Sequence, residues 1–357
     1  MKLIRDIDVL SASQKRIEFL FDNFKTIRVS VSSGKDSSVI FSLCLREAIK
    51  RNRKIEVLFI DQEAEYQSSI DVIEECMVHP NIIPLWYQVP IYMTNSTSES
   101  DYFLYAWGEN EKWIRDKHPL AIKSIDGDYK KRFYTIFDYL DKQSPDTINV
   151  IGLRAEESIT RYRATTKTAG YNDIKWSTKA KHSYKFYPIY DWSVSDVWKY
   201  IYDFNVKYNK IYDLMFMDGK SIYSEMRVSN LIHEKSFKCL IDLPKYEPET
   251  YNKMCNRING ISTASRYASE KLMFSNRTLP THYNTWLEFR DFLLGNIQNE
   301  EHKSIFTQRF ETQSKDEITY KAQVGQLLIN DFENSKSFNT QREEKLNNMR
   351  DKWKNIL

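Results

Sequence analysis

The sequence lacks the features that would mark a disulfide-stapled, metal-clustered or membrane-spanning protein. Its four cysteines, Cys44, Cys76, Cys239 and Cys255, form no C-x-x-C and no adjacent pair. Zinc and iron–sulfur ligation are therefore poorly supported, and a reducing compartment is favoured. No apolar run approaches the roughly 20 residues of a membrane helix. No apolar segment of a signal peptide follows the first residues, so we expect a cytoplasmic protein without a membrane partner.

Neither sign of charge is in large excess. The chain has 52 basic and 49 acidic residues in 357, a formal net charge of +3. This balance argues against a general polyanion-coating protein but leaves a local basic groove open. The hydrophobic share of 41% and the charged share of 28% are ordinary for a globular protein, and the length allows one large domain or two to three.

An anion-binding turn is the most informative stretch. An apolar β-branched run ending near Val31 leads into a polar turn, and a helical pattern follows it. The turn consists of Ser32, Ser33, Gly34, Lys35, Asp36, Ser37 and Ser38. Strand, turn and helix N-terminus in this order direct backbone N–H groups and the helix dipole at an anion. The alternative is an ordinary βα turn with a serine cap, which four hydroxyls beside Gly-Lys-Asp disfavour.

Further strands are predicted at residues 55–61, 82–87 and 147–152, alternating with helices near 13–24 and 68–77. This alternation predicts a parallel sheet with right-handed crossovers, in which ligands bind beyond the carboxyl ends of the strands. Asp36, Asp61 and Arg154 all fall at or just past strand ends. Residues 91–139 interrupt the pattern and are predicted to form an excursion over the site, with residues 130–132 interpreted as a solvated helix face.

A second polar cluster follows the strand at 147–152. Gly152 would let the backbone approach a ligand closely. Arg154 and Arg161 could grip phosphate or sulfate oxygens with fork geometry, and Glu157 could hold one of them in place. The alternative is a surface ion-pair network on a helix.

Residues 161–185 form a basic loop. Seven basic residues face one acid, Asp173, and aromatic residues are interleaved with them. The seven are Arg161, Arg163, Lys167, Lys175, Lys179, Lys181 and Lys185. Such a loop would suit a nucleic-acid backbone or another large anion, or a lid that closes on ATP phosphates.

The rest of the chain is predicted to be mainly helical. Ser193 or Ser195 can cap a helix whose apolar face carries Val197, Trp198 and Ile201. Helices are also expected beyond residue 280. The last 20 or so residues, around Leu346, Met349 and Trp353, are predicted to form a terminal helix that either docks a partner or second copy or packs on the domain.

Taken together, these motifs resemble a known class. The turn is similar to the Ser-Gly-Gly-x-Asp-Ser loop of ATP pyrophosphatases of the adenine-nucleotide α-hydrolase class. The Gly-Leu-Arg-Ala-Glu-Glu-Ser-x-x-Arg run at 152–161 and the run at 188–213 resemble the phosphoadenylyl-sulfate reductase branch. Residues 60–66 and 247–260 resemble the immunoglobulin-binding regulator A proteins, which are often encoded beside a ParB-like partner. The resemblance covers about residues 10 to 265.

The resemblance implies a Rossmann-like α/β fold over residues 1–225, with a mainly helical region at 226–357. Residues 32–38 would hold the β/γ-phosphates of ATP, and Asp36 would orient the loop or a Mg²⁺ ion. The main chain at 29–31 and Asp61 would border the adenosine. Gly152, Arg154 and Arg161 would meet the reacting α-phosphate or its sulfate equivalent. Lys35, Asp36, Arg154 and Arg161 are thus the candidate catalytic residues.

Two departures from the family pattern bear on the reaction. Ser33 replaces the usual first glycine of the loop. The reductase's C-terminal cysteine motif and its paired cluster cysteines are absent, so no iron–sulfur cluster is expected. We therefore predict an ATP pyrophosphatase-type enzyme that adenylylates an unidentified acceptor and releases pyrophosphate. A sulfonucleotide reductase or sulfurtransferase, and a non-catalytic nucleotide-binding regulator with a ParB-like partner, are the alternatives. Nucleic-acid binding and a homo-oligomer also stay open.

Overall fold

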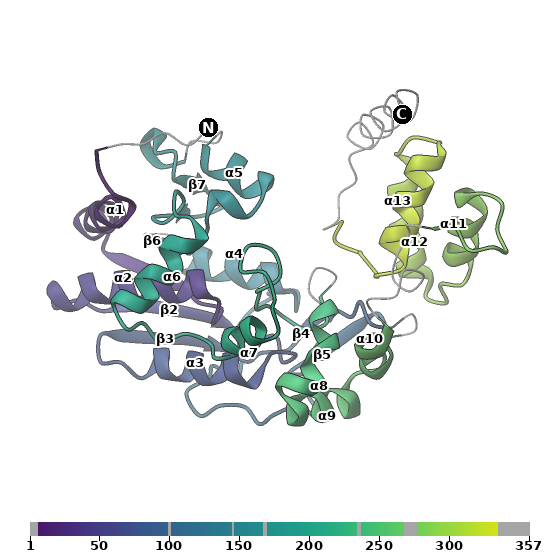
Figure 1. The fold of residues 1–357 in the computed structure, drawn as a ribbon, viewed down its shortest axis with the longest axis horizontal. Helices are drawn as coiled ribbons and strands as arrows, with labels where there is room; N and C mark the ends of the chain where they lie inside the picture. The colour runs from purple at the N-terminus through teal and green to yellow at the C-terminus, as the bar shows by residue number, and fades with distance from the viewer. Residues whose placement is uncertain are drawn as a thin grey trace. The chain divides into compact units, whose positions relative to one another are not determined.

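A six-stranded sheet organises the N-terminal part of the chain (Figure 1). The computed structural model describes residues 6–98, 101–144, 146–166, 170–233, 237–267 and 278–334. The strand order is β3-β2-β1-β6-β8-β7. The first five are parallel, and β7 runs antiparallel to β8. The strands are β1 Thr26–Ser30, β2 Ile55–Ile60, β3 Ile82–Tyr87, β6 Thr147–Ile151, β7 Ser177–Lys179 and β8 Tyr184–Phe186.

Seven α-helices accompany this sheet among the described residues. They are α1 Val9–Asn23, α2 Lys35–Lys50, α3 Gln67–Met77, α4 Phe133–Gln143, α5 Ile159–Thr166, α6 Val194–Asp203 and α7 Ile211–Met217. The fold is a mostly parallel, Rossmann-like sheet flanked by helices, which confirms the predicted fold class. The strand and helix bounds agree with the sequence expectation to within a few residues.

One apolar core joins the sheet to its helices. Ile27, Val29 and Val57 belong to the same buried cluster as residues of α1, α2, α3 and α6. Because side chains alternate along a strand, Arg28 lies on the other face of β1. There it pairs with Glu56 at 2.8 Å and with Asp141 of α4 at 3.4 Å. The buried Arg28 thus ties two strands to a helix.

The segment before α4 differs from its prediction. Lys130 and Lys131 have φ of 52° and 48°, and Arg132 is the residue that precedes α4. The interpretation of residues 130–132 as a helix face is therefore wrong, since the left-handed backbone places them in a turn. The Lys131 ammonium donates to the Tyr105 hydroxyl at 2.7 Å.

The chain divides into two compact units, Met1–Tyr92 with Tyr105–Asn230, and Met93–Leu104 with Leu231–Leu357. The pair of strands β4 Ile91–Thr94 and β5 Phe103–Ala106 carries the chain from one unit to the other and back. In the second unit, the Ser96 hydroxyl donates to the Ile329 carbonyl at 2.8 Å, and the Asn330 amide donates to the Asn95 carbonyl at 3.1 Å.

The remaining described residues of the second unit form helices joined by turns. Its helices are η3 Phe237–Ile241, α8 Leu243–Tyr246, α9 Pro248–Arg257, α10 Ile261–Tyr267, α11 Trp286–Gly295, α12 Glu300–Glu311 and α13 Glu317–Leu327. Phe306, Phe310 and Leu327 form a small core there. The terminal helix predicted around Leu346 to Trp353 lies outside the described residues.

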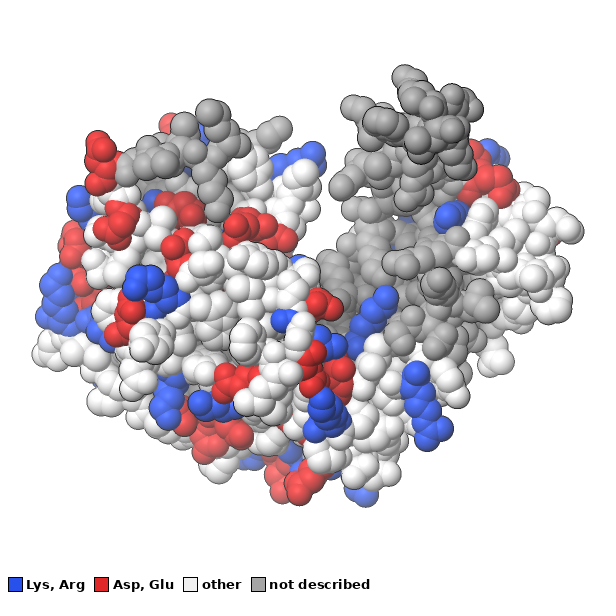
Figure 2. All heavy atoms as spheres, in the orientation of Figure 1, with Lys and Arg blue, Asp and Glu red and all other residues white. Residues whose placement is uncertain are grey.

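Charged residues of both signs are interspersed on the face drawn in Figure 2, in line with the near-balanced composition. None of the helices in the described ranges is long and apolar enough to cross a membrane.

Candidate anion-binding site

The predicted turn joins β1 to the N-terminus of α2. Ser33 adopts a left-handed backbone conformation with φ of 56°. The Ser37 hydroxyl accepts from the Ser32 N–H at 3.2 Å and donates to the Gly34 carbonyl at 2.8 Å. The Ser38 hydroxyl donates to the same carbonyl at 3.2 Å. The serines thus brace the turn internally, and the helix starts without a side-chain cap.

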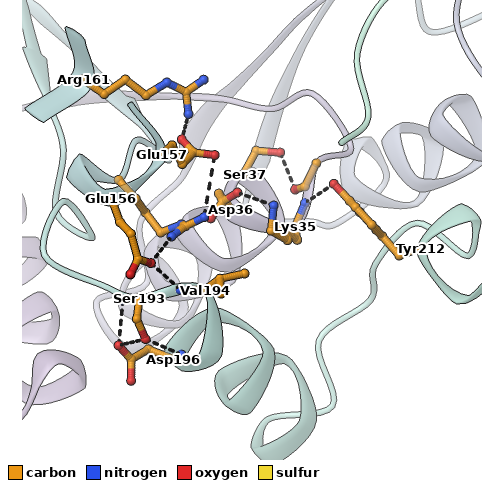
Figure 3. A network of polar contacts seen from close by, with 12 residues as sticks. Lys35, Asp36, Ser37, Glu156, Glu157, Arg161, Ser193, Val194, Asp196 and Tyr212 are labelled. Carbon is orange, nitrogen blue, oxygen red and sulfur yellow. Dashed lines mark hydrogen bonds and ion pairs between the residues drawn. The ribbon is translucent and has the colours of Figure 1, made fainter. Parts of the chain in front are cut away.

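Lys35 and Asp36 open α2 as an ion pair. The Lys35 ammonium lies 3.2 Å from one oxygen of Asp36, and both side chains are largely buried. The other oxygen of Asp36 pairs with the Nε of Arg154 (Figure 3). Burial lowers the pKa of Lys35, and the Asp36 carboxylate opposes that shift. The turn therefore holds two cations around one carboxylate.

Gly152 brings β6 against the start of α2. A Cβ at Gly152 would lie 2.5 Å from the carbonyl oxygen of Asp36 and 3.0 Å from the backbone nitrogen of Ser37. Only glycine fits there, because the neighbouring atoms are backbone and cannot move aside cheaply. The contact sets the distance from Arg154 to Asp36. The predicted contact of Gly152 with a nucleotide stays a prediction.

Arg154 is surrounded by carboxylates. Besides Asp36, it pairs with Glu156 at 3.2 Å and with Glu157 at 3.7 Å, and the whole residue is 3% exposed. Each nitrogen of the guanidinium therefore faces a protein carboxylate. Such a complete set of partners makes Arg154 a hub that joins the loop after β6 to the turn.

Arg161 is the more available of the two predicted arginines. It lies on α5, pairs with Glu157, and its side chain is 45% exposed. Partial burial lowers the pKa of Arg161, Asp36 opposes the shift, and the nearby charges of Arg227 and Arg154 add to it. Arg227 also lowers the pKa of Lys35. Four cations thus share one region, and sequence reasoning did not assign Arg227 to it.

The segment after α6 and the first turn of α7 contact the turn. The Tyr212 hydroxyl accepts from the backbone N–H of Lys35 at 3.2 Å. The Asn209 amide donates to the hydroxyls of Ser33 at 3.4 Å and Ser69 at 3.0 Å. The run at 188–213, known from the sequence only by resemblance, therefore braces the turn. Local sequence patterns did not predict that the Tyr212 hydroxyl and the Asn209 amide would contact the turn.

The Asp61 side chain has hydrogen-bond partners at both carboxylate oxygens. Its Oδ2 accepts from Trp86 Nε1 at 3.2 Å and from Gln88 Nε2 at 2.9 Å. Its Oδ1 accepts from the Glu63 N–H at 2.9 Å and pairs with Arg115. Asp61 is fully buried, and its carboxylate holds Arg115 of the excursion. The predicted place of this strand end beside an adenosine stays a prediction.

Two glutamates complete this buried acidic cluster. Glu63 accepts from the backbone N–H groups of Trp107 at 2.9 Å and Ile114 at 3.1 Å. Burial and the charge of Asp61 raise the pKa of Glu65 to about 8. The carboxylates of Asp61 and Glu63, directly after β2, thus bind residues of the excursion and hold it at the end of that strand.

The donors around Asp36 do not fit a magnesium ion. Mg²⁺ takes oxygen ligands in near-octahedral geometry, usually one or two carboxylates with phosphates and waters. Both oxygens of Asp36 are already paired with cations, Lys35 and Arg154, whose charge would repel a metal ion. Nor do three or more His, Cys, Asp or Glu side chains gather as metal ligands anywhere in the ranges that the structure describes. The predicted role of Asp36 as a Mg²⁺ ligand is therefore not supported.

A parallel sheet with a cation-rich turn at the carboxyl end of its central strand defines a nucleotide-binding class of protein. Residues 26–218, more than half of the chain, match the phosphoadenosine phosphosulfate reductase domain, and the chain belongs to this family. Residues 221–355 match a domain of unknown function, DUF3440. The resemblance to the reductase branch is thereby confirmed.

The chain is also similar to individual proteins and solved structures. The chain is 28% identical to the uncharacterized protein YbdN of Escherichia coli over 313 residues, which cover 83% of this chain and 77% of that protein. Phosphoadenylyl-sulfate reductase from Candida auris, solved as a phosphate complex, matches at 14% identity and a TM-score of 0.35, covering 61% of this chain and 90% of that one. FMN adenylyltransferase from Candida glabrata, solved with ATP, matches at 14% identity and a TM-score of 0.35, covering 59% and 62%.

Proposed function

We propose that the protein is an ATP-binding enzyme that cleaves ATP at the α-phosphate, adenylylates an acceptor and releases pyrophosphate. One observation carries the proposal. Lys35, Arg154 and Arg161 converge with the N-terminus of α2 at the carboxyl end of the sheet, because Lys35 and Arg154 both pair with Asp36, and Arg154 and Arg161 both pair with Glu157. Such a site supplies positive charge and backbone N–H groups to a polyphosphate.

The geometry supports a division of roles during in-line displacement at the α-phosphorus. A bond forms from the acceptor oxygen or nitrogen to phosphorus while the bond to the β-phosphate oxygen breaks, and its electron pair leaves with pyrophosphate. Lys35 and the first turn of α2 would neutralise the pyrophosphate, and Arg161 would stabilise charge on the equatorial oxygens. The acceptor proton passes to water. No step is assigned to a metal held by Asp36.

The cysteines lend support to this reaction over sulfonucleotide reduction. Burial raises the pKa of Cys44 above its ordinary range and that of Cys76 to about 12. Thiols in this state are poor nucleophiles, and a reductase needs a reactive thiol to take up the sulfonate. Cys239 and Cys255 are partly buried in the second unit. Thiol-dependent release of sulfite that requires either of them would favour the reductase alternative.

Incubation with α-labelled ATP tests the proposal. We expect labelled AMP or an adenylylated product together with pyrophosphate, and we expect Arg161→Ala to abolish both. Arg132→Ala, which removes an exposed arginine that precedes α4, is the matched control and should leave the products unchanged. Absence of all three products with every acceptor tried, nucleic acid included, would contradict the proposal.

An acceptor surface extends from Arg161 along α5 and β7, which lie side by side (Figure 1). The exposed Tyr162 stands between Arg161 and Arg163. Within the described part of the chain, none of four exposed cations has an ion pair or side-chain hydrogen bond. They are Arg163, Lys175, Lys179 and Lys181. Free cations beside an exposed ring suit a single-stranded nucleic acid, which we propose as the acceptor.

Binding of fluorescent single-stranded RNA and DNA oligonucleotides tests this surface. The triple variant Lys175→Ala, Lys179→Ala, Lys181→Ala should weaken binding and lower its salt dependence by about three phosphate contacts. The control changes three exposed lysines elsewhere in the same unit, Lys25, Lys54 and Lys112, to alanine. Equal loss in both triple variants would mean non-specific attraction and would overturn the surface. A ParB-like partner and a homo-oligomer stay predictions from the sequence.

A further inference from the structure

Glu156 joins the anion site to the helix α6. One of its oxygens, Oε2, lies 3.2 Å from the Arg154 guanidinium and accepts from the backbone N–H of Val194 at 3.0 Å (Figure 3). Val194 is the first residue of α6, and its N–H has no partner within the helix. The carboxylate therefore meets both a buried cation and the positive end of a helix dipole.

The other end of this contact reaches the turn. The Arg154 guanidinium pairs with Glu156 and also with Asp36, which is the second residue of α2. A second connection from α6 ends one residue earlier, since the Trp198 ring packs edge-on against Tyr212 at 5.4 Å and the Tyr212 hydroxyl binds the Lys35 N–H. Two sets of contacts that start at α6 thus end at the consecutive residues Lys35 and Asp36 of the turn.

We propose that Glu156 is a positioning residue, which fixes Arg154, and through it Asp36, in the orientation from which Lys35 and Arg161 face the anion. This inference rests on the proposed function for the identity of the anion. Glu156 pairs with Arg154, and Arg154 pairs with Asp36, so the ion pairs that link Glu156 to the turn pass through Arg154. Without Glu156, the guanidinium keeps two carboxylates, Asp36 and Glu157, and is free to turn between them.

A matched pair of variants at the N-terminus of α6 separates this role from ordinary helix capping. Asp196 accepts from the Ser193 N–H at 2.8 Å and completes the capping box, without a contact to Arg154. Both Glu156→Ala and Asp196→Ala should therefore increase amide hydrogen exchange at residues 193–197. Only Glu156→Ala should also increase exchange at residues 32–38, which Glu156 does not touch.

Binding of inorganic pyrophosphate and of ATP, measured by calorimetry on the full chain, provides the second readout. Glu156→Ala should weaken both about tenfold, the size of one lost charge-assisted hydrogen bond, and Asp196→Ala should change them by less than about twofold. Glu156→Gln, which keeps an acceptor oxygen for Val194 but lacks the charge, should fall between them and replaces Glu156→Ala if that variant does not fold.

The outcomes distinguish this inference from the proposed function. Unchanged exchange at residues 32–38 in both Glu156 variants, with α6 loosened, would overturn the positioning role. If the unmodified protein binds neither ATP nor pyrophosphate, the proposed function fails, while the exchange data still decide whether Glu156 orders the turn.

Discussion

Gly152 lies against the main chain of Asp36 so closely that a Cβ on the glycine would come 2.5 Å from the Asp36 carbonyl oxygen. Gly152 directly follows β6 and Asp36 lies in the first turn of α2, and these two elements meet at the carboxyl end of the sheet. Arg154 follows Gly152 by two residues and pairs with the Asp36 side chain. The glycine thus sets the approach on which the ion pairs of the anion site depend.

We therefore expect Gly152→Ala to push the start of α2 away from β6. Pyrophosphate and ATP binding should fall at least about tenfold, and the free energy of unfolding should drop by roughly 1–3 kcal/mol, because a methyl group overpacks against backbone. Calorimetry and urea unfolding measure the two effects. Gly295→Ala is the control, since nothing lies within 4 Å of a Cβ there, and it should not destabilise the protein. Unchanged binding in Gly152→Ala would contradict this account.

The two arginines of the site should separate stability from binding. Arg154 is buried among three carboxylates, so Arg154→Ala should cost roughly 3–5 kcal/mol of unfolding free energy by leaving buried charge uncompensated. Arg161 is half-exposed, so Arg161→Ala should leave the melting temperature nearly unchanged while weakening ATP binding. Thermal unfolding and ATP titration of both variants check this. A large loss of stability in Arg161→Ala together with an unchanged stability in Arg154→Ala would contradict this division of roles.

Stability should depend on pH through Glu65. Burial raises its pKa in the folded protein to about 8, whereas the unfolded chain has the ordinary lower value. Between the two values the folded state holds a proton that the unfolded state lacks, so stability falls as pH rises, by at most about 1.4 kcal/mol per pH unit. Urea unfolding from pH 5 to 8 should show this slope, and Glu65→Gln should flatten it. Glu109→Gln, at an exposed position, should retain the slope.

Replacement by glycine should raise the stability of the protein at Ser33 and lower it at Ser32. Its φ of 56° is a left-handed conformation that costs an L-residue about 1 kcal/mol. Ser33→Gly removes that cost but loses the 3.4 Å contact with Asn209 and makes the unfolded chain more flexible. We expect a net gain of a few tenths of a kcal/mol, visible as a small rise in melting temperature. Ser32→Gly, at a position without positive φ, should lower the melting temperature.

Local patterns of the sequence were enough to predict the sheet and the turn, and the class followed from the resemblance of the motifs to a known family. The runs at 55–60 and 82–87 are apolar over the length of a buried strand, and Gly-Lys-Asp-Ser follows the first strand directly. These features depend on neighbouring residues, because strand burial and helix starts are properties of short segments. The turn at residues 130–131 was not predicted, because the sequence there contains no glycine to mark its left-handed backbone.

Partners distant in sequence were decided by tertiary structure alone. Arg154 and Asp36 are 118 positions apart, and Lys35 and Tyr212 are 177 apart. No spacing rule connects such residues, because their distance depends on how β6, α2 and α7 pack. The same packing places the Asp61 carboxylate beside the Arg115 guanidinium and the Glu156 carboxylate beside the Val194 N–H.

The sequence by itself thus determined a parallel sheet and a polar turn after its first strand, the candidate anion site, since periodicity and turn chemistry are local. Only the tertiary structure decided how the charges are shared: Asp36 between two cations, Arg154 among three carboxylates, and Arg161 half-exposed. Ion pairs form between charges that folding brings close together, and the packing of the helices on the sheet decides which charges those are.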